Sequence, residues 1–448
     1  MKDLTFFVKD DYAREPIPLS ERRGWIAIAF VWFAAATDMV AVLIGSILAE
    51  GQTVLNALIA VLIANIILGV IGGLCCYVGG ATRLSTGMIT RFVFGEWGSR
   101  LITALIVISF FFMFGVDVGL FGEMFQFLLL EVVGIELTVS WAAFIGGLLM
   151  TITATVGYIA IERLSLVAFP LMLFLMAGLM GAVLGSEKKK EWLTTLPDAG
   201  ITMSMGSAIS FVLASWIIIV VISPDIARWA KTKKDAFLSG FFGFLIGNSV
   251  MISLSVILFR ITGATDIVDI FLALGWGMFA ILIIILAQWT TNDNFLYTSG
   301  LGLATLFRNV PKYVLTLIIG FLGSCLAYMQ LQDYFMVFTA LSGALLAPIT
   351  AIYLVDFFLL NRNRFAFSFI QQKKLPPFYW KAFVSWGIAS AIGLMTVPVE
   401  EGGVEWFQLT GASSLDAFII AAALHWLLGI IGNRLFTPQP KEEETAHA

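Results

Sequence analysis

Long apolar segments separated by short polar stretches occupy most of this chain, and they limit the folds that it can adopt. Hydrophobic residues make up 59% of the 448 residues and charged residues only 12%, and the mean hydropathy is +0.95. Because a bilayer core requires about 20 apolar residues per helix, these values are typical of a polytopic membrane protein. The sequence therefore predicts an all-α fold with twelve transmembrane helices. The expected spans are 24–48, 54–80, 100–130, 139–160, 164–185, 204–229, 236–262, 271–305, 312–330, 334–361, 379–398 and 414–436.

The distribution of positive charge predicts how these helices are oriented. An even number of spans places both chain ends on one side, and most of the 26 lysine and arginine residues fall on that side. Since short cytoplasmic loops are rich in these residues, we expect both termini in the cytoplasm and the chain in the inner (cytoplasmic) membrane. The lipid bilayer is then the expected surrounding. No basic cluster in the sequence is long enough to indicate binding to nucleic acid, and nothing in the sequence predicts an obligate protein partner.

A polar stretch, Gln288–Asn294, interrupts the eighth apolar segment and predicts a binding site inside the membrane. Apart from Trp289, every residue in this stretch is polar, and such residues must face protein or a water-filled cavity. The helical repeat places Ala287, Thr290, Thr291 and Asn294 on one broad face, whose oxygen atoms would suit a sodium ion or a polar, planar solute. Hydrogen bonding between helices is the alternative role, but so many adjacent polar residues favour a site.

Two acidic residues at membrane depth are further functional candidates. Asp38 lies near the middle of the first segment, and Asp117 lies among small residues in the third. An ionisable residue inside a membrane helix indicates function by default, although Asp117 could instead accept bonds from backbone donors. In the sixth segment, Pro224 predicts that the helix kinks or ends. Trp216 could stack on a flat solute, but the residues alone favour a packing role.

The polar stretch also carries a resemblance to a known family. Trp289–Asn294, followed by Tyr297 and Ser299–Gly302, resembles the eighth helix of bacterial members of the nucleobase:cation symporter-1 family. Further motifs that match the family are Leu84–Gly87 with Arg91–Gly95, Asp225–Trp229 and Gly247–Ser249. The resemblance implies a leucine-transporter-like fold, with a 5+5 inverted repeat plus two C-terminal helices. Helices 1 and 6 would be broken near the membrane midplane.

The resemblance also divides the chain into parts. Residues 1–23 would form a cytoplasmic N-terminal arm, 24–185 the first five-helix repeat, and 204–361 the second, inverted repeat. Helices 11 and 12 would occupy 379–436, and 437–448 would form a cytoplasmic tail. Transporters of this kind bind solute and ion at the helix breaks and expose them to each side of the membrane in turn.

The same resemblance implies a cation site and a substrate site. Sodium would be held by backbone carbonyls and side-chain hydroxyls of helices 1 and 8. The residues implied are Ala34, Thr37, Ala287, Thr290 and Thr291. The solute would stack on Trp216 of helix 6, and Asn292 of helix 8 would read its polar edge.

Three residues depart from the pattern of the cytosine permeases within that family. Phe110 and Met113 stand where helix 3 of those proteins carries Gln and Trp, and Asp38 stands where helix 1 usually carries an aromatic residue. We expect these residues, with Asp117, to line the substrate site. Because a site that hydrogen-bonds its solute discriminates strongly, the substrate can differ from cytosine. Our hypothesis is that Asp38 meets an amino or cationic group of the solute, or carries a coupling proton.

The expected function is symport, in which a sodium ion or a proton drives import of cytosine or a related nucleobase by alternating access. No cofactor is expected besides the coupling ion. The alternative solutes are other nitrogen heterocycles, namely an aminopyrimidine, a purine, or a hydantoin- or allantoin-like compound. A channel is disfavoured because no segment shows a selectivity filter or a row of gating charges, and a sensor with a transporter fold is a further alternative. Without a metal-ligand set or a nucleophile paired with a histidine, we expect no enzymatic activity.

Overall fold

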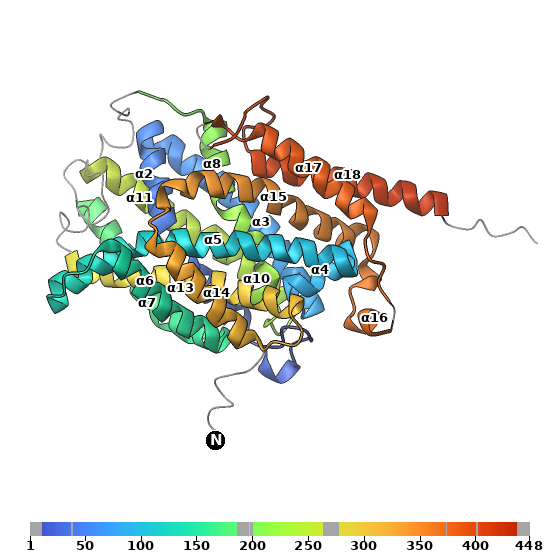
Figure 1. Cartoon of the computed structure of the whole chain (residues 1–448). Helices are drawn as coiled ribbons and strands as arrows, with labels where there is room; N and C mark the ends of the chain where they lie inside the picture. Colours follow the sequence, from blue (N-terminus) through green and yellow to red (C-terminus); the bar gives the residue numbers. More distant parts are fainter. Residues whose placement is uncertain are drawn as a thin grey trace, which may run out of the picture.

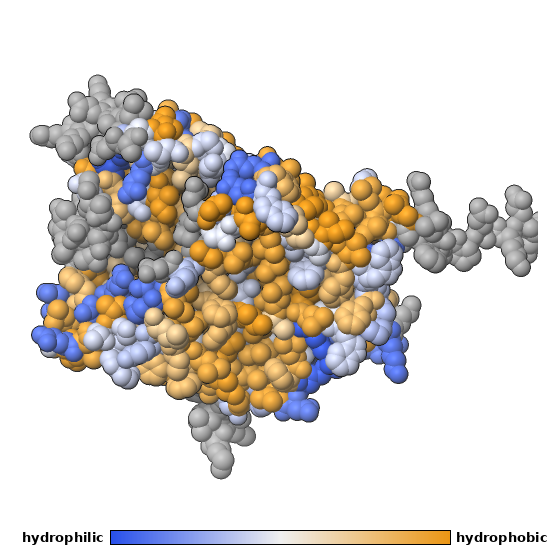
Figure 2. All heavy atoms as spheres, turned by 45° about the horizontal axis from the view of Figure 1, so that its top comes forward, coloured by the Kyte–Doolittle hydropathy of each residue, from blue (hydrophilic) through white to orange (hydrophobic). Residues whose placement is uncertain are grey.

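The computed structural model describes residues 11–36, 39–185, 197, 200–262, 277–372, 374–399 and 402–436. Within these ranges the chain forms a bundle of helices (Figure 1), together with an isolated bridge between Arg23 and Ala230. The predicted all-α class is therefore confirmed. Figure 2 shows that apolar residues cover most of the face in view, as expected for a surface that contacts lipid.

The helices fall into two groups along the chain. Those before residue 186 are η2 (Leu19–Glu21), α1 (Trp25–Ala35), α2 (Met39–Gly51), α3 (Val54–Thr82), α4 (Thr86–Phe94), α5 (Glu96–Leu128), η3 (Leu129–Val133), α6 (Val139–Val156) and α7 (Tyr158–Gly185). Those after residue 200 are α8 (Met205–Val221), α9 (Ser223–Ala227), α10 (Lys233–Phe242), η4 (Gly243–Asn248), α11 (Ser249–Thr262), α13 (Gly277–Leu306), α14 (Lys312–Tyr328), η5 (Gln332–Tyr334), α15 (Phe335–Val355), η6 (Asp356–Leu360), η7 (Arg362–Arg364), α16 (Phe367–Gln372), α17 (Trp380–Thr396) and α18 (Ser413–Phe436).

The helices of the described part do not all meet the length expected for a membrane span. By length and composition, 7 helices of the described part can cross a membrane, or up to 8 if the bent pair α1 and α2 counts as one span. Helices α8 and α14 are apolar but shorter. Each predicted segment contains a helix, but residues 271–276 of the eighth lie outside the described residues. Twelve spans therefore stay a prediction.

Helices 1 and 6 are both interrupted, as the resemblance implied. Helix α1 ends at Ala35 and α2 begins at Met39, and the two helices are bent by 57° relative to each other. Helix α8 ends at Val221, and α9 follows with Pro224 in its first turn. Proline lacks an N–H group and clashes with a preceding helical turn, so it fits the start of a helix better than its interior. The helix end predicted at Pro224 is confirmed.

Two local features differ from the prediction. The spans expected at 139–160 and 164–185 meet earlier in the chain, because α6 ends at Val156 and α7 begins at Tyr158. Gly157 between them has a φ of +95°, a conformation that glycine adopts at little cost. It ends α6 although the apolar pattern continues. The buried helix α4, which starts directly after Ser85, was not predicted.

Helices in equivalent positions of the two expected repeats pack against each other. Helix α3 packs on α10, α5 on α13, and α6 on α14. Helix α13 also contacts α1, α7 and α14, so it is surrounded on several sides. Helices α17 and α18 pack on each other and on α15, at the edge of the bundle in Figure 1. This arrangement buries the polar stretch of α13 inside the bundle.

Candidate substrate and cation sites

Helix α13 presents its polar residues on three faces, each of which meets a different helix. An α-helix turns by about 100° per residue, so residues three or four apart share a face. The three groups are Gln288 with Asn292, Ala287 with Thr290 and Thr291, and Trp289 with Asp293. They meet α5, the end of α1 and α6, respectively.

The first face is bonded to α5 through Asp117. Gln288 Nε2 donates to Asp117 Oδ1 at 2.6 Å, and Asn292 Nδ2 donates to Asp117 Oδ2 at 2.8 Å. All three residues are buried. Further along the same contact, the rings of Phe110 and Phe295 lie 5.5 Å apart, so α5 and α13 run antiparallel here. Asp117 therefore joins helix 3 to helix 8 and fixes the orientation of the Asn292 amide.

The second face of α13 meets the end of α1. Thr291 Oγ1 donates to the carbonyl oxygen of Ala35 at 2.8 Å and lies 3.4 Å from that of Ala287. Thr290 Oγ1 donates to the same Ala287 carbonyl at 2.7 Å. Carbonyl and hydroxyl oxygens from two helices thus gather beside the break in helix 1, in a buried region. Such oxygen atoms are the ligands that hard cations prefer.

The residues that the resemblance implied as sodium ligands stay a prediction, and the structure places those that it describes as follows. The three residues of α13 gather at this face, but Thr37 lies outside the described residues. Ala34 is buried near the end of α1, where its carbonyl oxygen accepts a bond from the N–H of Ala36. The carbonyl that Thr291 contacts belongs to Ala35. Sequence reasoning did not name Ala35, because a contact to a backbone carbonyl leaves no signal in the side-chain pattern.

The third face carries a buried acid to which sequence reasoning assigned no role. Asp293 Oδ1 lies 2.6 Å from Thr153 Oγ1 of α6, which also accepts a bond from Trp289 Nε1 at 2.9 Å. Asp293 is fully buried, and its Oδ2 has no hydrogen-bond partner among the described residues. An anion with so few partners is costly at membrane depth. The spacing of four residues from Trp289 could have shown that Asp293 shares a face with Trp289 and not with Gln288 and Asn292.

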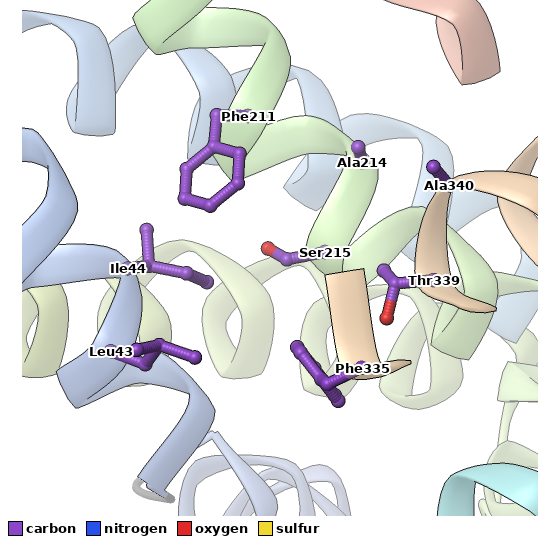
Figure 3. Close-up of a pocket in the computed structure, with 8 residues that line it drawn as sticks. All are labelled: Leu43, Ile44, Phe211, Ala214, Ser215, Phe335, Thr339 and Ala340. Carbon is purple, nitrogen blue, oxygen red and sulfur yellow. The ribbon is translucent and has the colours of Figure 1, made fainter. Parts of the chain in front are cut away.

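A narrow cavity lies between α2, α8 and α15, next to two of the predicted substrate residues. Its lining side chains are Leu43, Ile44, Phe211, Ala214, Ser215, Phe335, Thr339 and Ala340 (Figure 3). Together with the space at its mouth it has an empty volume of about 320 Å³. Ser215 immediately precedes Trp216 in α8, and Thr339 Oγ1 lies 3.9 Å from Met113 Sδ. We call it the α2–α8–α15 cavity.

The predicted substrate residues have different surroundings. Asp117 bonds Asn292 directly, whereas Phe110 packs on an α13 ring. The ring of Trp216 packs edge-on against Phe244, with centroids 6.1 Å apart, and its Nε1 has no hydrogen-bond partner in the described part of the chain. Asp38 lies outside the described residues. Among the predicted substrate residues that the structure describes, Asp117 and Asn292 are joined by a hydrogen bond between helices α5 and α13.

The N-terminal arm, of which residues 11–23 are described, packs into one end of the bundle. Asp11 Oδ2 and Lys312 Nζ form an ion pair at 2.7 Å, with side chains only 3% and 0% exposed. The Arg228 guanidinium donates to the carbonyl oxygen of Asp11 at 2.7 Å and to Tyr297 Oη at 2.9 Å. Since Lys312 begins α14, Arg228 follows α9 and Tyr297 lies in α13, the arm is connected to these three helices.

Further contacts of the arm reach α13 and Ser85, the residue that precedes α4. Arg14 Nε donates to the carbonyl oxygen of Ala304 at 2.7 Å, and Ser85 Oγ donates to that of Ala13 at 3.0 Å. Sequence reasoning did not find this closure, since it treated the arm only as a polar end. The Asp225–Trp229 motif, which contains a basic residue in an apolar setting, was the available signal.

These features define a class of protein. Two broken helices, paired helices from two halves, and an oxygen-lined site between helices 1 and 8 are those of a transporter with an inverted repeat, rather than of an enzyme. The model of the family described as permeases for cytosine/purines, uracil, thiamine and allantoin matches residues 16–435. The chain belongs to this family and is a multi-pass membrane protein.

Curated relatives and solved structures agree with this assignment. The cytosine permease of Escherichia coli strain K12 is 29% identical over 432 residues, which cover 96% of each chain. Mhp1, a nucleobase-cation-symport-1 family transporter, has a closed structure with bromovinylhydantoin bound. It matches at a TM-score of 0.77 and 18% identity, over 95% of this chain and 96% of that one. The inward-facing structure of Mhp1 matches at 0.71 and 18% identity, over 94% and 93%. The leucine-transporter-like fold is confirmed.

Proposed function

We propose that this chain is a symporter that imports cytosine or a related nucleobase together with a sodium ion. The observation that carries the proposal is the arrangement of α13, which offers hydroxyl and carbonyl oxygens to the helix 1 break and an amide to helix 3. One rigid helix thereby serves both ligands, so occupation of one site can favour the conformation that binds the other. The E. coli relatives named as cytosine permeases support the choice of solute.

The proposed cation site uses the oxygens beside the helix 1 break. The hydroxyls of Thr290 and Thr291 already lie within hydrogen-bond distance of the carbonyls of Ala287 and Ala35. A sodium ion would turn the hydroxyl lone pairs toward itself and share those carbonyls. The bound ion would then join α13 to the end of α1. Ala34 and Thr37 would be the further ligands that family resemblance suggests.

In the proposed substrate site, Asn292 is the residue that reads the solute. Its Nδ2 is held by Asp117, so Oδ1 is left as a buried acceptor without a partner among the described residues. A buried acceptor selects a solute that presents an amino or ring N–H group, because an unpaired acceptor is costly. Cytosine, other aminopyrimidines and purines all present such groups. Trp216, Phe110 and Met113 would supply apolar contacts.

The family resemblance supports the remaining parts of the proposal. Residues 24–185 and 204–361 would be the two repeats, followed by helices 11 and 12 in 379–436. The arm 1–23 and the tail 437–448 would both lie in the cytoplasm, with the chain in the inner membrane. Asp38 would meet an amino group of the solute or carry a proton. Alternating access would open the helix breaks to each side in turn.

Ligand-dependent thermal stability of the purified protein tests both ligands at once. A ligand that binds only the folded state raises apparent stability according to its concentration relative to its Kd. We expect cytosine to stabilise, and sodium to enhance this effect relative to choline. A panel should include purines, hydantoins and allantoin. If one of these stabilises and cytosine does not, the solute assignment is wrong, although the transporter class stands.

The cation site has a direct mutational test. Thr290→Ala with Thr291→Ala should remove the sodium-dependent part of the thermal shift and of uptake, a loss of at least tenfold in apparent sodium affinity. Thr305→Ala is the matched control, because its hydroxyl bonds a carbonyl of its own helix at 2.7 Å, just as that of Thr290 does. An unchanged sodium response in the double variant would exclude this site.

Proton coupling is a second candidate, which the buried Asp293 favours. Uptake into vesicles that contain no sodium, driven by an imposed pH gradient, separates the two ions. Proton coupling through this residue requires such uptake in the wild type and its loss in Asp293→Asn. Sodium coupling requires no uptake without sodium in either protein.

A further inference from the structure

A second cavity lies far along the chain from the proposed transport site, at one end of the last helices. It is bounded by η6, the segment after η7, and helices α17 and α18, which Figure 1 shows at the edge of the bundle. With the space at its mouth it has an empty volume of about 1090 Å³. Among its lining residues are Asp356, Arg364, Tyr379, Lys381, His425 and Gly429. None of these belongs to the proposed substrate or cation site.

The cavity holds a guanidinium group whose bonding capacity is incompletely used. Arg364 lies over the ring of Tyr379, with 5.1 Å from its Cζ to the ring centroid, and its buried Nε has no hydrogen-bond partner among the described residues. Its closest approach to the Asp356 carboxylate is 3.7 Å, which is too long for a hydrogen bond. That carboxylate instead accepts a bond from Asn361 Nδ2 at 2.6 Å. The Arg364 guanidinium is therefore oriented but available.

Two further groups on the wall could donate to an anion. Lys381 is a second basic residue on the wall, so two basic side chains face the single lining carboxylate of Asp356. His425 is only 5% exposed, and neither of its ring nitrogens has a hydrogen-bond partner in the described residues, although Nε2 lies 3.6 Å from Asp356. A planar guanidinium, an ammonium and an imidazole are the donors that commonly bind a phosphate.

The surroundings of the cavity place it at the level of the membrane interface. Phe378 and Trp380, at the start of α17, are 50% and 59% exposed, and such aromatic residues are enriched where the bilayer meets water. On α18, Trp426 is 44% exposed and lies about one helical turn from the lining residue Gly429. A ligand with a phosphate in the cavity would therefore have an apolar surface beside it for acyl chains.

We propose that this cavity binds the headgroup of an anionic phospholipid, with its phosphate on Arg364 and Lys381 and its acyl chains along α18. Basic pockets between membrane helices are typical sites for such lipids. The assignment rests on the excess of positive charge, the under-bonded guanidinium and the adjoining apolar surface. It gives helices 11 and 12, which follow the two repeats, a ligand of their own.

Native mass spectrometry of the intact purified chain with added lipid tests the proposal. We expect phosphatidylglycerol to be retained more strongly than phosphatidylcholine. Arg364→Gln with Lys381→Gln should weaken phosphatidylglycerol binding about tenfold or more, because each of the two basic residues is expected to increase the affinity for the anionic headgroup. The matched control is Lys234→Gln with Lys374→Gln, which removes two exposed basic residues outside the cavity and should change little.

Further measurements test the proposal if the double variant fails, and distinguish a lipid phosphate from a soluble one. If the double variant does not fold, Lys381→Glu alone places a negative charge on the cavity wall and should still abolish the preference for phosphatidylglycerol. Equal binding of the two lipids by the wild type, or equal loss in the control, overturns the proposal. Thermal stabilisation by glycerol phosphate as strong as that by the lipid would assign the cavity to a soluble phosphate instead, and would also overturn it.

Discussion

The sixth predicted segment, which contains α8 and α9, has its two ends in regions that are closed by different kinds of contact. Near its end, Arg228 and the N-terminal arm are joined by charged and hydrogen-bonded contacts, including the buried pair of Asp11 and Lys312. Near its start, Phe211 and Ala214 line the α2–α8–α15 cavity, whose walls are mainly apolar. The arm end is thus held mainly by directional bonds between side chains, whereas the cavity at the other end is enclosed mainly by apolar packing.

This difference indicates how the two closures can respond to a ligand. Hydrogen bonds and ion pairs that share residues break together, because leaving one buried partner alone is costly. Apolar walls can separate by small steps as side chains change rotamer, each at a modest cost. In a protein that alternates between two states, the arm end is therefore expected to behave as a switch with two discrete positions, and the cavity end as a more gradual opening.

The largest effect is expected when the ion pair of the arm is broken on one side. Lys312→Met leaves the Asp11 carboxylate buried without its cation, which typically costs about 3–5 kcal/mol. We expect the arm to detach, with a lower thermal midpoint and impaired uptake. The measurement is maleimide labelling of Ala13→Cys in a Cys325→Ser background, which should be slow with Lys312 present and fast without it.

A double substitution provides the control for this prediction. Asp11→Asn with Lys312→Met removes both charges, so it should recover part of the stability lost in Lys312→Met. If the double variant is as unstable as the two single variants added together, the two groups act independently, and the ion pair does not hold the arm.

An intermediate effect is expected at the apolar end. Ala214→Leu would fill the α2–α8–α15 cavity. If solute passes here, uptake should fall several-fold, while the thermal midpoint stays within a few degrees because the new apolar contacts in the cavity offset the strain of the larger side chain. Transport by reconstituted protein and thermal unfolding measure the two quantities. Ala104→Leu, on a half-buried part of α5, is the control. Unaltered uptake in Ala214→Leu would show that the cavity is not part of the path.

The features that could be predicted from the sequence are local ones. Apolar segment length, the break at Pro224 and the polar faces of α13 all depend on residues close together in the chain, and the structure confirms the helix break and the buried polar face. Periodicity alone placed Thr290 and Thr291 on one face. The fold-level repeat came from family resemblance, because hydropathy does not reveal how helices pair.

The contacts that escaped prediction join distant residues or use the backbone. Asp11 and Lys312 are separated by 301 positions, and no local pattern pairs them. The carbonyl of Ala35 has no distinguishing side chain. The helix end at Gly157 depends on a positive φ, which the sequence does not reveal. The role of Asp117 depends on which α13 face meets α5. Sequence reasoning reaches these only when a fold is supplied from elsewhere.

The smallest effect tests whether hydrogen bonds rather than packing hold the arm end. Tyr297 Oη accepts bonds from Arg228 at 2.9 Å and from Trp229 Nε1 at 3.3 Å, while its ring lies under Lys312 Nζ at 4.5 Å. Tyr297→Phe keeps the ring but leaves two buried donors short of an acceptor, at a cost of about 1–3 kcal/mol. We expect a lower thermal midpoint and faster labelling at position 13.

Tyr158→Phe is the matched control for this comparison. The Tyr158 ring stacks on Trp229 at 4.5 Å, but its buried hydroxyl has no hydrogen-bond partner in the described part of the chain. Removing that hydroxyl should therefore leave stability unchanged or slightly higher, since an unpaired buried polar group is itself unfavourable. Equal losses in the two variants would mean that the hydroxyl of Tyr297 contributes no more than one without partners. The arm end would then be held by packing and by its ion pair, and the two closures would differ less than the contacts suggest.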